Sequence, residues 1–240
     1  MKVLLVSNEY PITENIGTPS IRIQKEILDE MGVDIDVYPI EMGNKAKYVK
    51  AALHFLLENF RKKKYDIIHS YYGLSGFVAV LQKKIPVVAT FLGSDILAEG
   101  RHNDRDRWFS QFALKRAREV IVMSEEMKQR SGREDAHVIP FGVHLDAFQL
   151  ESKATARKKL GLSMSRPYIL FPWEPARKVK RFDLVVEAMR HVNAELPEAE
   201  VLAVYNQSHQ KVVDYLNACD VIVMASDHEG SPVAIREALA

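Results

Sequence analysis

The stretch that decides the fold is DVIVMASDHEGSPVAIREALA, residues 220–240. Residues 220–225 form an apolar, β-branched run, which is typical of a buried strand in a parallel sheet. A polar segment follows, and Ser231 and Pro232 then provide an N-cap residue and a first-turn proline, so a helix is expected to begin there. The stretch therefore predicts a strand, a loop and a helix, which is one repeat of an α/β fold.

Two carboxylates flank this predicted helix start. Glu229 lies in the loop, and Glu237 lies about a turn and a half into the helix. Ligands of open α/β sheets bind at the carboxyl ends of the strands, and helix N-termini attract anions. A ligand with hydroxyl groups at both ends and phosphate between them would suit this arrangement. A plain strand–helix connection is an equally good interpretation, because Glu126 and Glu134 have the same spacing on an expected helix surface.

The composition narrows the class of protein. Apolar residues make up 47% of the 240, which supports a core, and a formal net charge of +1 gives no global field for nucleic acid. The single cysteine, Cys219, excludes an internal disulfide and is expected to be a small core residue in a reducing compartment. No signal-peptide pattern follows Met1, and no apolar run approaches the ~18 residues of a membrane span. We therefore expect a soluble, cytoplasmic protein.

Short apolar strands alternate with amphipathic helices through residues 1–150, which predicts a Rossmann-like parallel sheet. The loop after the first strand has one glycine, Gly17, and no G-x-G-x-x-G. A dinucleotide cofactor is therefore not expected, although a phosphate can approach the backbone at Gly17. The predicted strands cover residues 3–6, 33–38, 66–70, 86–91, 119–123 and 137–140, and the helices cover 20–31, 46–64, 74–84, 105–118 and a segment that follows Ser124.

The carboxyl edge of this sheet collects further polar residues. Gly93, Ser94 and Asp95 follow the fourth strand, and His69 lies near the end of the third, on the edge where Gly17 is also expected. Two interpretations of His69 remain open: it faces a cleft at this edge, or it is a strand-end histidine whose hydrogen bonds are made internally.

The expected helix over residues 46–64 is rich in lysine. Lys45, Lys47 and Lys50 lie at its start, and residues 61–64, RKKK, lie at its end. Cations near a helix C-terminus are favoured by the dipole, and this explains most of the pattern. The alternative is an interfacial helix that contacts anionic lipid.

The amino-acid composition of the sequence changes after residue 150. Residues 151–166 are polar and charged, so we expect a linker between a domain of residues 1–150 and a second domain of residues 167–240. The second domain offers strands at 168–171, 200–205 and 220–225, with helices at 182–196, 210–218 and the chain end. A doubly wound half usually has five or six strands. We predict two Rossmann-like domains that face a cleft, the second incomplete, in a fragment or a compact variant.

Five segments resemble glycosyltransferase family 4, whose members are retaining enzymes with the two-Rossmann GT-B fold. Singly these motifs are weak, but their order along nearly the whole chain matches the family, with an acceptor-side domain first and a nucleotide-sugar domain second. The segments are TFLGSDIL (90–97), REVIVMSEEMKQR (118–130), HVIPFGV (137–143), KVKRFDLVVEAM (178–189) and SDHEGSPVAIREALA (226–240).

The resemblance implies roles for the closing stretch. Glu229, Gly230 and Ser231 correspond to the carboxylate and backbone amides that hold the donor sugar. Glu237 corresponds to the carboxylate that binds the ribose hydroxyls of the donor.

The resemblance also implies where the diphosphate binds. Lys180 corresponds to the lysine on the donor diphosphate, and Gly17 to the glycine loop that approaches it from the first domain. Gly93, Ser94 and Asp95 lie at the motif of the inner cleft. Cations suit this position because negative charge builds on the departing diphosphate, and the family needs no metal or other cofactor to absorb it.

The sequence departs from the family at two positions. Where members often have an arginine five residues before the lysine, this chain has Pro175, and we expect Arg177 to substitute; a solvated loop arginine is the alternative. Many members have a histidine where this chain has Leu92, so any role of that imidazole is absent.

The expected function is therefore retaining transfer of a sugar from a nucleoside-diphosphate sugar to a glycan or lipid-linked acceptor, in cell-envelope polysaccharide or glycolipid biosynthesis. The expected enzyme is a metal-independent hexosyl- or glycosyltransferase without cofactors, in the cytoplasm or at the inner face of an anionic membrane. Nucleic acid is not an expected partner. A nucleotide-sugar epimerase or phosphorylase of the same fold and a nucleotide-sugar-binding module without turnover are the alternatives.

Overall fold

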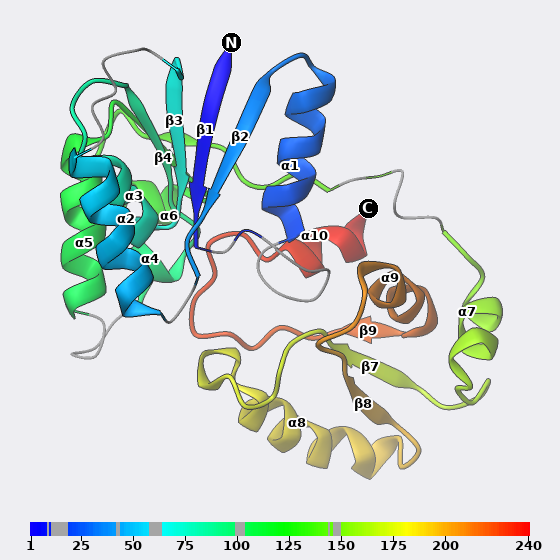
Figure 1. Cartoon of the computed structure of the whole chain (residues 1–240). Helices are drawn as coiled ribbons and strands as arrows, with labels where there is room; N and C mark the ends of the chain where they lie inside the picture. Colours follow the sequence, from blue (N-terminus) through cyan, green and yellow to red (C-terminus); the bar gives the residue numbers. More distant parts are fainter. Residues whose placement is uncertain are drawn as a thin grey trace. The chain divides into compact units, whose positions relative to one another are not determined.

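The protein forms two compact α/β units (Figure 1). The computed structural model describes residues 1–8, 10, 19–41, 44–57, 64–98, 104–143, 145 and 150–240. The first unit comprises residues 1–141 together with 229–231, and the second comprises residues 142–228 together with 232–240. The domain limits drawn from the sequence, with a linker at residues 151–166, stay a prediction.

The first unit is built on a six-stranded sheet in the order β2-β1-β3-β4-β5-β6, and every neighbouring pair is parallel. This confirms the predicted α/β class with a parallel sheet. The strands are β1 (Lys2–Ser7), β2 (Asp34–Pro39), β3 (Ile67–Tyr71), β4 (Val87–Thr90), β5 (Glu119–Val122) and β6 (His137–Val138).

Helices cover both faces of this sheet (Figure 1). Because side chains alternate along a strand, Val3 and Leu5 of β1 pack on one face with Ile21, while Leu4 and Val6 join the larger core on the other. The helices are α1 (Pro19–Glu30), α2 (Lys45–Leu57), α3 (Gly73–Ala79), α4 (Ser94–Leu97), α5 (Asp104–Arg116) and α6 (Glu125–Ser131).

The second unit has a three-stranded parallel sheet in the order β8-β7-β9. The strands are β7 (Tyr168–Phe171), β8 (Glu200–Ala203) and β9 (Val221–Ile222). The helices are α7 (Lys153–Leu160), α8 (Phe182–Glu195), α9 (His209–Ala218) and α10 (Val233–Leu239).

Helix α7 belongs to the second unit through a buried arginine. The Arg157 guanidinium donates to Ala218 O at 3.0 Å, to Met164 O at 2.7 Å and to Asp220 Oδ2 at 2.8 Å. Asp220 Oδ2 also accepts from Tyr168 N at 2.8 Å, so one carboxylate joins α7 to the starts of β7 and β9.

The closing stretch differs from its expected form in two respects. The strand was expected to be buried over residues 220–225, but β9 has two residues and Val221 is 57% exposed. The reason is that β9 lies at the edge of the second sheet, with β7 as its only neighbour among the described strands. Helix α10 begins at Val233 with Pro232 at the N-cap, so Ser231 does not cap it as predicted.

Helix α3 of the first unit also differs from the prediction, whereas α2 begins where it was expected. Helix α3 ends at Ala79, earlier than expected, because the Gln82 side chain bonds the backbone of the following turn. Helix α2 buries Ala51 and Phe55, so other apolar side chains of this helix remain exposed. Residues 58–63 lie outside the described residues, and they include three of the four residues of the basic end, 61–64, that was predicted for this helix.

Candidate active site

A buried carboxylate shapes the carboxyl edge of the first sheet. Asp95 is 4% exposed, and its oxygens accept from Leu92 N at 3.1 Å, from Gly93 N at 2.9 Å and from Gly73 N at 3.1 Å. These bonds join the turn after β4 to the start of α3. Asp95, which the sequence placed at this edge, thus binds backbone N–H groups with its carboxylate. Its neighbour Ser94, placed at the same edge, is exposed.

Gly93 and Gly230 are close neighbours within the first unit, to which residues 229–231 belong. A Cβ atom on Gly93 would lie 2.9 Å from Gly230 N, and one on Gly230 would lie 2.0 Å from Leu92 O. Gly93 also has φ of 145°, a conformation that side chains rarely adopt. Both predicted glycines are therefore required by backbone geometry, and Glu229 lies beside this contact in the sequence.

The carboxyl end of β1 contributes a polar pair that the sequence analysis did not single out. Asn8 is buried, its N–H donates to Ser75 Oγ at 3.0 Å, and its Oδ1 accepts from the same hydroxyl at 3.2 Å. The sequence signal that could have identified Asn8 is its position as a polar residue directly after a buried strand. The predicted phosphate-facing Gly17 lies outside the described residues.

His69 lies in the middle of β3, on the side of the sheet that α1 covers. Its Nε2 pairs with Thr90 Oγ1 at 2.8 Å, and its Nδ1 lies 3.5 Å from the Tyr71 hydroxyl. Burial lowers the pKa of His69 from 6.5 to about 4, because the charged ring would lose its hydration. These contacts fit the interpretation of an internally satisfied histidine; a role in a cleft stays a prediction.

The second unit presents a buried lysine after β7. Lys180 is 7% exposed, and its Nζ lies 4.9 Å from the centre of the Trp173 ring. Such a position over an aromatic face is favourable for a cation. Lys180 ends a single 3-10 turn, Lys178–Lys180, whose N-cap is the exposed Arg177. The predicted cationic pair thus lies on one short turn.

An arginine clamp fixes this turn. The Arg181 guanidinium donates to Asp183 Oδ2 at 3.0 Å and to Asp227 Oδ1 at 3.0 Å, while Asp227 N donates to Val179 O at 3.0 Å. Arg181 has φ of 51°, so the chain turns sharply just before α8. The clamp ties the segment that contains Lys180 to the loop that follows β9.

Glu237 has a partner that sequence reasoning missed. His209, the first residue of α9, places Nε2 3.0 Å from Glu237 Oε1 on α10. The contact orients the carboxylate predicted to bind ribose hydroxyls. No sequence pattern links these positions, because the two residues come from different helices.

Ser231 leaves a hydroxyl available. Its Oγ is buried and has no hydrogen-bond partner among the described residues. Buried hydroxyls are normally paired, so this atom is a natural contact for a ligand.

Other reactive groups play no evident part. Cys219 is partly buried, and this burial raises the pKa of its thiol to about 12, so the thiol is protonated at neutral pH. Within the described ranges, no three His, Cys, Asp or Glu side chains gather closely enough to hold a metal ion. No described helix is long and apolar enough to cross a bilayer.

Comparison with known proteins assigns the family. The model of glycosyltransferase family 4 matches residues 9–147, more than half of the chain. The chain belongs to glycosyltransferase family 4. This confirms the resemblance that the motifs carry.

One relative has a name that describes it as a glycosyltransferase. The chain is 28% identical over 198 residues to Bacillus subtilis TuaC, whose name assigns it to teichuronic acid biosynthesis as a glycosyltransferase; the match covers 73% of this chain and 51% of TuaC. The chain therefore spans about half the length of that relative.

Solved GT-B structures share the fold. Sucrose-phosphate synthase of Thermosynechococcus elongatus aligns with a TM-score of 0.75 and 18% identity, over 99% of this chain and 78% of that one. An Anabaena protein, Alr3699/HepE, crystallised with UDP and glucose, aligns with a TM-score of 0.62 and 15% identity, over 100% and 78%.

Proposed function

We propose that this family 4 protein is a retaining glycosyltransferase that moves a sugar from a nucleoside-diphosphate sugar to a glycan or lipid-linked acceptor. The observation that carries the proposal is the family match over residues 9–147. The name of TuaC and the UDP and glucose bound by the Anabaena protein support an envelope glycan as product and a nucleotide sugar as donor.

The donor diphosphate is proposed to lie against Lys180. The leaving diphosphate gains negative charge as the sugar–phosphate bond breaks, and a preorganised cation stabilises that charge. Burial beside Trp173 limits the number of positions that the ammonium can take. The exposed Arg177 supplies a second cation, and the backbone at Gly17 is proposed to bind the same diphosphate.

The sugar and the ribose are proposed to bind at the closing stretch. Glu229, the Gly230 amide and the Ser231 hydroxyl hold the donor sugar, and Glu237 binds the ribose hydroxyls. The contact with His209 at 3.0 Å keeps the Glu237 carboxylate in one orientation. The acceptor oxygen attacks the front side of the sugar, and a donor phosphate oxygen takes its proton, so neither a metal, a cofactor nor a protein base is required.

The test is sugar transfer by the 240-residue chain and its variants. A thermal-shift screen against nucleotide sugars first identifies the donor, because a selective ligand raises stability by mass action. Lys180→Ala and Glu229→Gln are then expected to reduce transfer by about 10²–10³-fold. Lys178→Ala, which removes an exposed lysine from the same turn, is the matched control and should retain transfer.

A binding module without turnover is the second candidate. The three-stranded second sheet favours it, because a doubly wound half usually has five or six strands. Calorimetric titration with nucleoside diphosphates separates the candidates. Binding without transfer supports the module, transfer supports the enzyme, and a folded chain that binds no nucleotide contradicts both. Product analysis separates transfer from epimerisation or phosphorolysis.

Peripheral contact with an anionic membrane, at its cytoplasmic face, is also proposed. Helix α2 has lysines at its start and no acidic residue, and its apolar side chains are 50–77% exposed at Val49, Leu53, Leu56 and Leu57. Such a face suits an interfacial helix. Co-sedimentation with anionic vesicles at low salt is expected and should fail for Leu53→Glu. Absence of co-sedimentation by the unaltered chain would remove this part of the proposal.

A further inference from the structure

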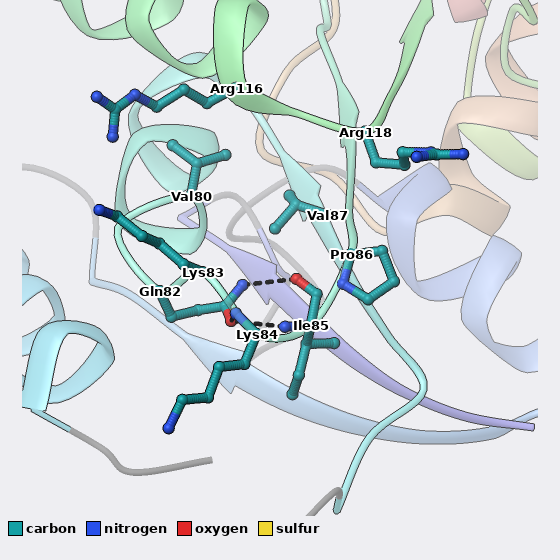
Figure 2. A pocket seen from close by; sticks show the side chains of 9 residues that line it. All are labelled: Val80, Gln82, Lys83, Lys84, Ile85, Pro86, Val87, Arg116 and Arg118. Carbon is teal, nitrogen blue, oxygen red and sulfur yellow. Dashed lines mark hydrogen bonds between the residues drawn. The ribbon is translucent and has the colours of Figure 1, made fainter. Parts of the chain in front are cut away.

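A hollow lies at the amino edge of the first sheet, where β4 begins (Figure 2). The cavity has a volume of about 450 Å³, within the range of small-molecule sites. Buried Val80, Ile85 and Val87 form its apolar part. This edge is the amino end of the parallel strands, whereas the candidate active site is at the carboxyl end. The lining residues are Val80, Gln82, Lys83, Lys84, Ile85, Pro86, Val87, Arg116 and Arg118.

Every charged side chain in the lining is a cation. Lys83, Lys84, Arg116 and Arg118 are all exposed, and the lining contains no Asp or Glu. Glu119 approaches one of them, with Oε1 3.7 Å from Arg118 Nε. In Figure 2 the side chains of Lys83 and Arg116 extend on one side of the hollow, and Arg118 extends on the other. The positive charge is therefore spread along the hollow.

The loop that carries the two lysines is fixed by a buried amide. Gln82 Nε2 donates to Ala79 O at 3.3 Å and to Ile85 O at 2.8 Å, and its Oε1 accepts from Lys84 N and Ile85 N, both at 2.9 Å. Gln82 is 7% exposed. Four hydrogen bonds from one side chain hold the backbone of the loop, so the cations project from a preorganised frame.

A simple helix-end effect does not account for these cations. Basic residues often collect where the carbonyls of a helix end carry partial negative charge. At the end of α5, however, Arg133 Nη1 already donates to Leu114 O and, at 3.3 Å, to Ala117 O. Arg116 instead lies over the Phe112 ring, 4.2 Å from its centre. The carbonyls of Leu114 and Ala117 are thus bound by Arg133, a residue outside the lining, and not by the cations of the hollow.

We propose that this hollow binds an extended anion with two or more oxyanion groups, such as a polyphosphate or a short uronic acid chain. The arginine forks pair with oxyanions, and the lysines add point charges. The volume of the cavity is larger than one small ion requires. The apolar side chains of its wall can contact the part of the ligand that links its charged groups. The site is independent of donor binding and lies at the other end of the strands.

The test uses the full chain with tripolyphosphate, with trigalacturonate and with inorganic phosphate. Binding is measured by calorimetry at low and high salt. Lys83→Glu and Arg116→Glu are expected to weaken binding of the multivalent probe at least about tenfold, because each converts an attraction into a repulsion. Lys115→Glu is the matched control, since it makes the same charge change on α5 with an exposed residue outside the lining.

Each result of these binding measurements either supports or overturns the proposed site. Tight binding of tripolyphosphate alone identifies a phosphate ligand, and tight binding of trigalacturonate alone identifies an acidic glycan; either supports the site if Lys115→Glu binds normally. Equal weakening by Lys115→Glu overturns it, because the attraction would then come from general charge. No multivalent binding by the folded chain, or binding no tighter than that of inorganic phosphate, also overturns it. Sugar transfer is measured separately and is expected to be retained in Lys83→Glu.

Discussion

Asp95 in the first unit and Arg181 in the second both hold a turn at the carboxyl end of a sheet, but they do so in different surroundings. Asp95 is 4% exposed and accepts hydrogen bonds from three backbone N–H groups. The side chain of Arg181 is 35% exposed, and its acidic partners Asp183 and Asp227 are 65% and 51% exposed. Solvent screens the second arrangement and not the first.

The two edges differ in what they provide: the first provides a fixed backbone geometry, and the second provides positive charge. In the first unit the buried carboxylate accepts from three backbone N–H groups, so it fixes the geometry of the edge, above all at Gly93. In the second unit the exposed clamp leaves Lys180 and Arg177 on the turn that it holds. Substitutions at the edge of the first unit should therefore lower the free energy of unfolding. Substitutions at the edge of the second unit should mainly weaken ligand binding.

The two tryptophans allow each unit to be followed alone. The chain has two, Trp108 on α5 and Trp173 after β7. Replacing one of them by Phe leaves the other as the only tryptophan, so its fluorescence reports the unfolding in urea of the unit in which it lies.

The largest effect is expected for Asp95→Ala. It leaves three N–H groups without their acceptor, and a loss of about 3–5 kcal/mol is expected in the unfolding free energy. Urea unfolding with Trp108 as the reporter measures it. Ser94→Ala, at the exposed neighbour, should change stability by less than about 0.5 kcal/mol. A similar small change for Asp95→Ala would break the comparison.

Arg157→Leu sharpens the comparison by removing a buried anchor from the second unit. It leaves two carbonyls without their donor and removes one of the two donors to Asp220 Oδ2, and about 2–4 kcal/mol is expected to be lost. Lys153 still pairs with Asp220, which limits the loss. The Trp173 transition should shift to lower urea. Lys158→Leu, at an exposed residue of the same helix, is the control.

Acid should weaken the first unit through His69. Its pKa is about 4 when folded against 6.5 as the ordinary value, so between these pH values the unfolded chain binds the extra proton. Stability should therefore fall as pH drops from about 6.5 to 4, by up to about 3 kcal/mol. Unfolding followed at Trp108 should lose this dependence in His69→Gln and keep it in His137→Gln, which alters an exposed histidine. An unchanged profile in His69→Gln would assign the dependence to other groups.

The smallest effect on stability is expected for Arg181→Ala. Exposed ion pairs contribute about 0–1 kcal/mol, so the Trp173 transition should barely move. Nucleotide binding should weaken more clearly, because the turn that carries Lys180 loses its clamp. If the unfolding free energy instead fell as far as in Asp95→Ala, the two edges would not differ in kind.

The sequence predicted the elements well where periodicity was strong. The strand at residues 168–171 and the helix over 182–196 match β7 and α8 closely, because both have clear apolar periods. It was wrong about the burial of residues 220–225 and about Ser231 as a cap. Burial depends on which strands flank β9, and residue types in one segment do not contain that information.

The candidate site was predictable only in part. Glycines at 93 and 230 were found from loop motifs, and the structure gives a steric reason for each. His209 beside Glu237 and Asn8 beside Ser75 were not found, since each pair joins residues far apart in the chain.

By itself, the sequence determined the α/β class, the alternation of strands and helices and the family, because local periodicity and short motifs encode them. Tertiary structure alone decided that Asp95 is bound to backbone, that His69 is buried and uncharged, and that four cations surround one hollow. Desolvation and pairing depend on neighbours that only folding brings together, so these properties cannot be assigned from residue type.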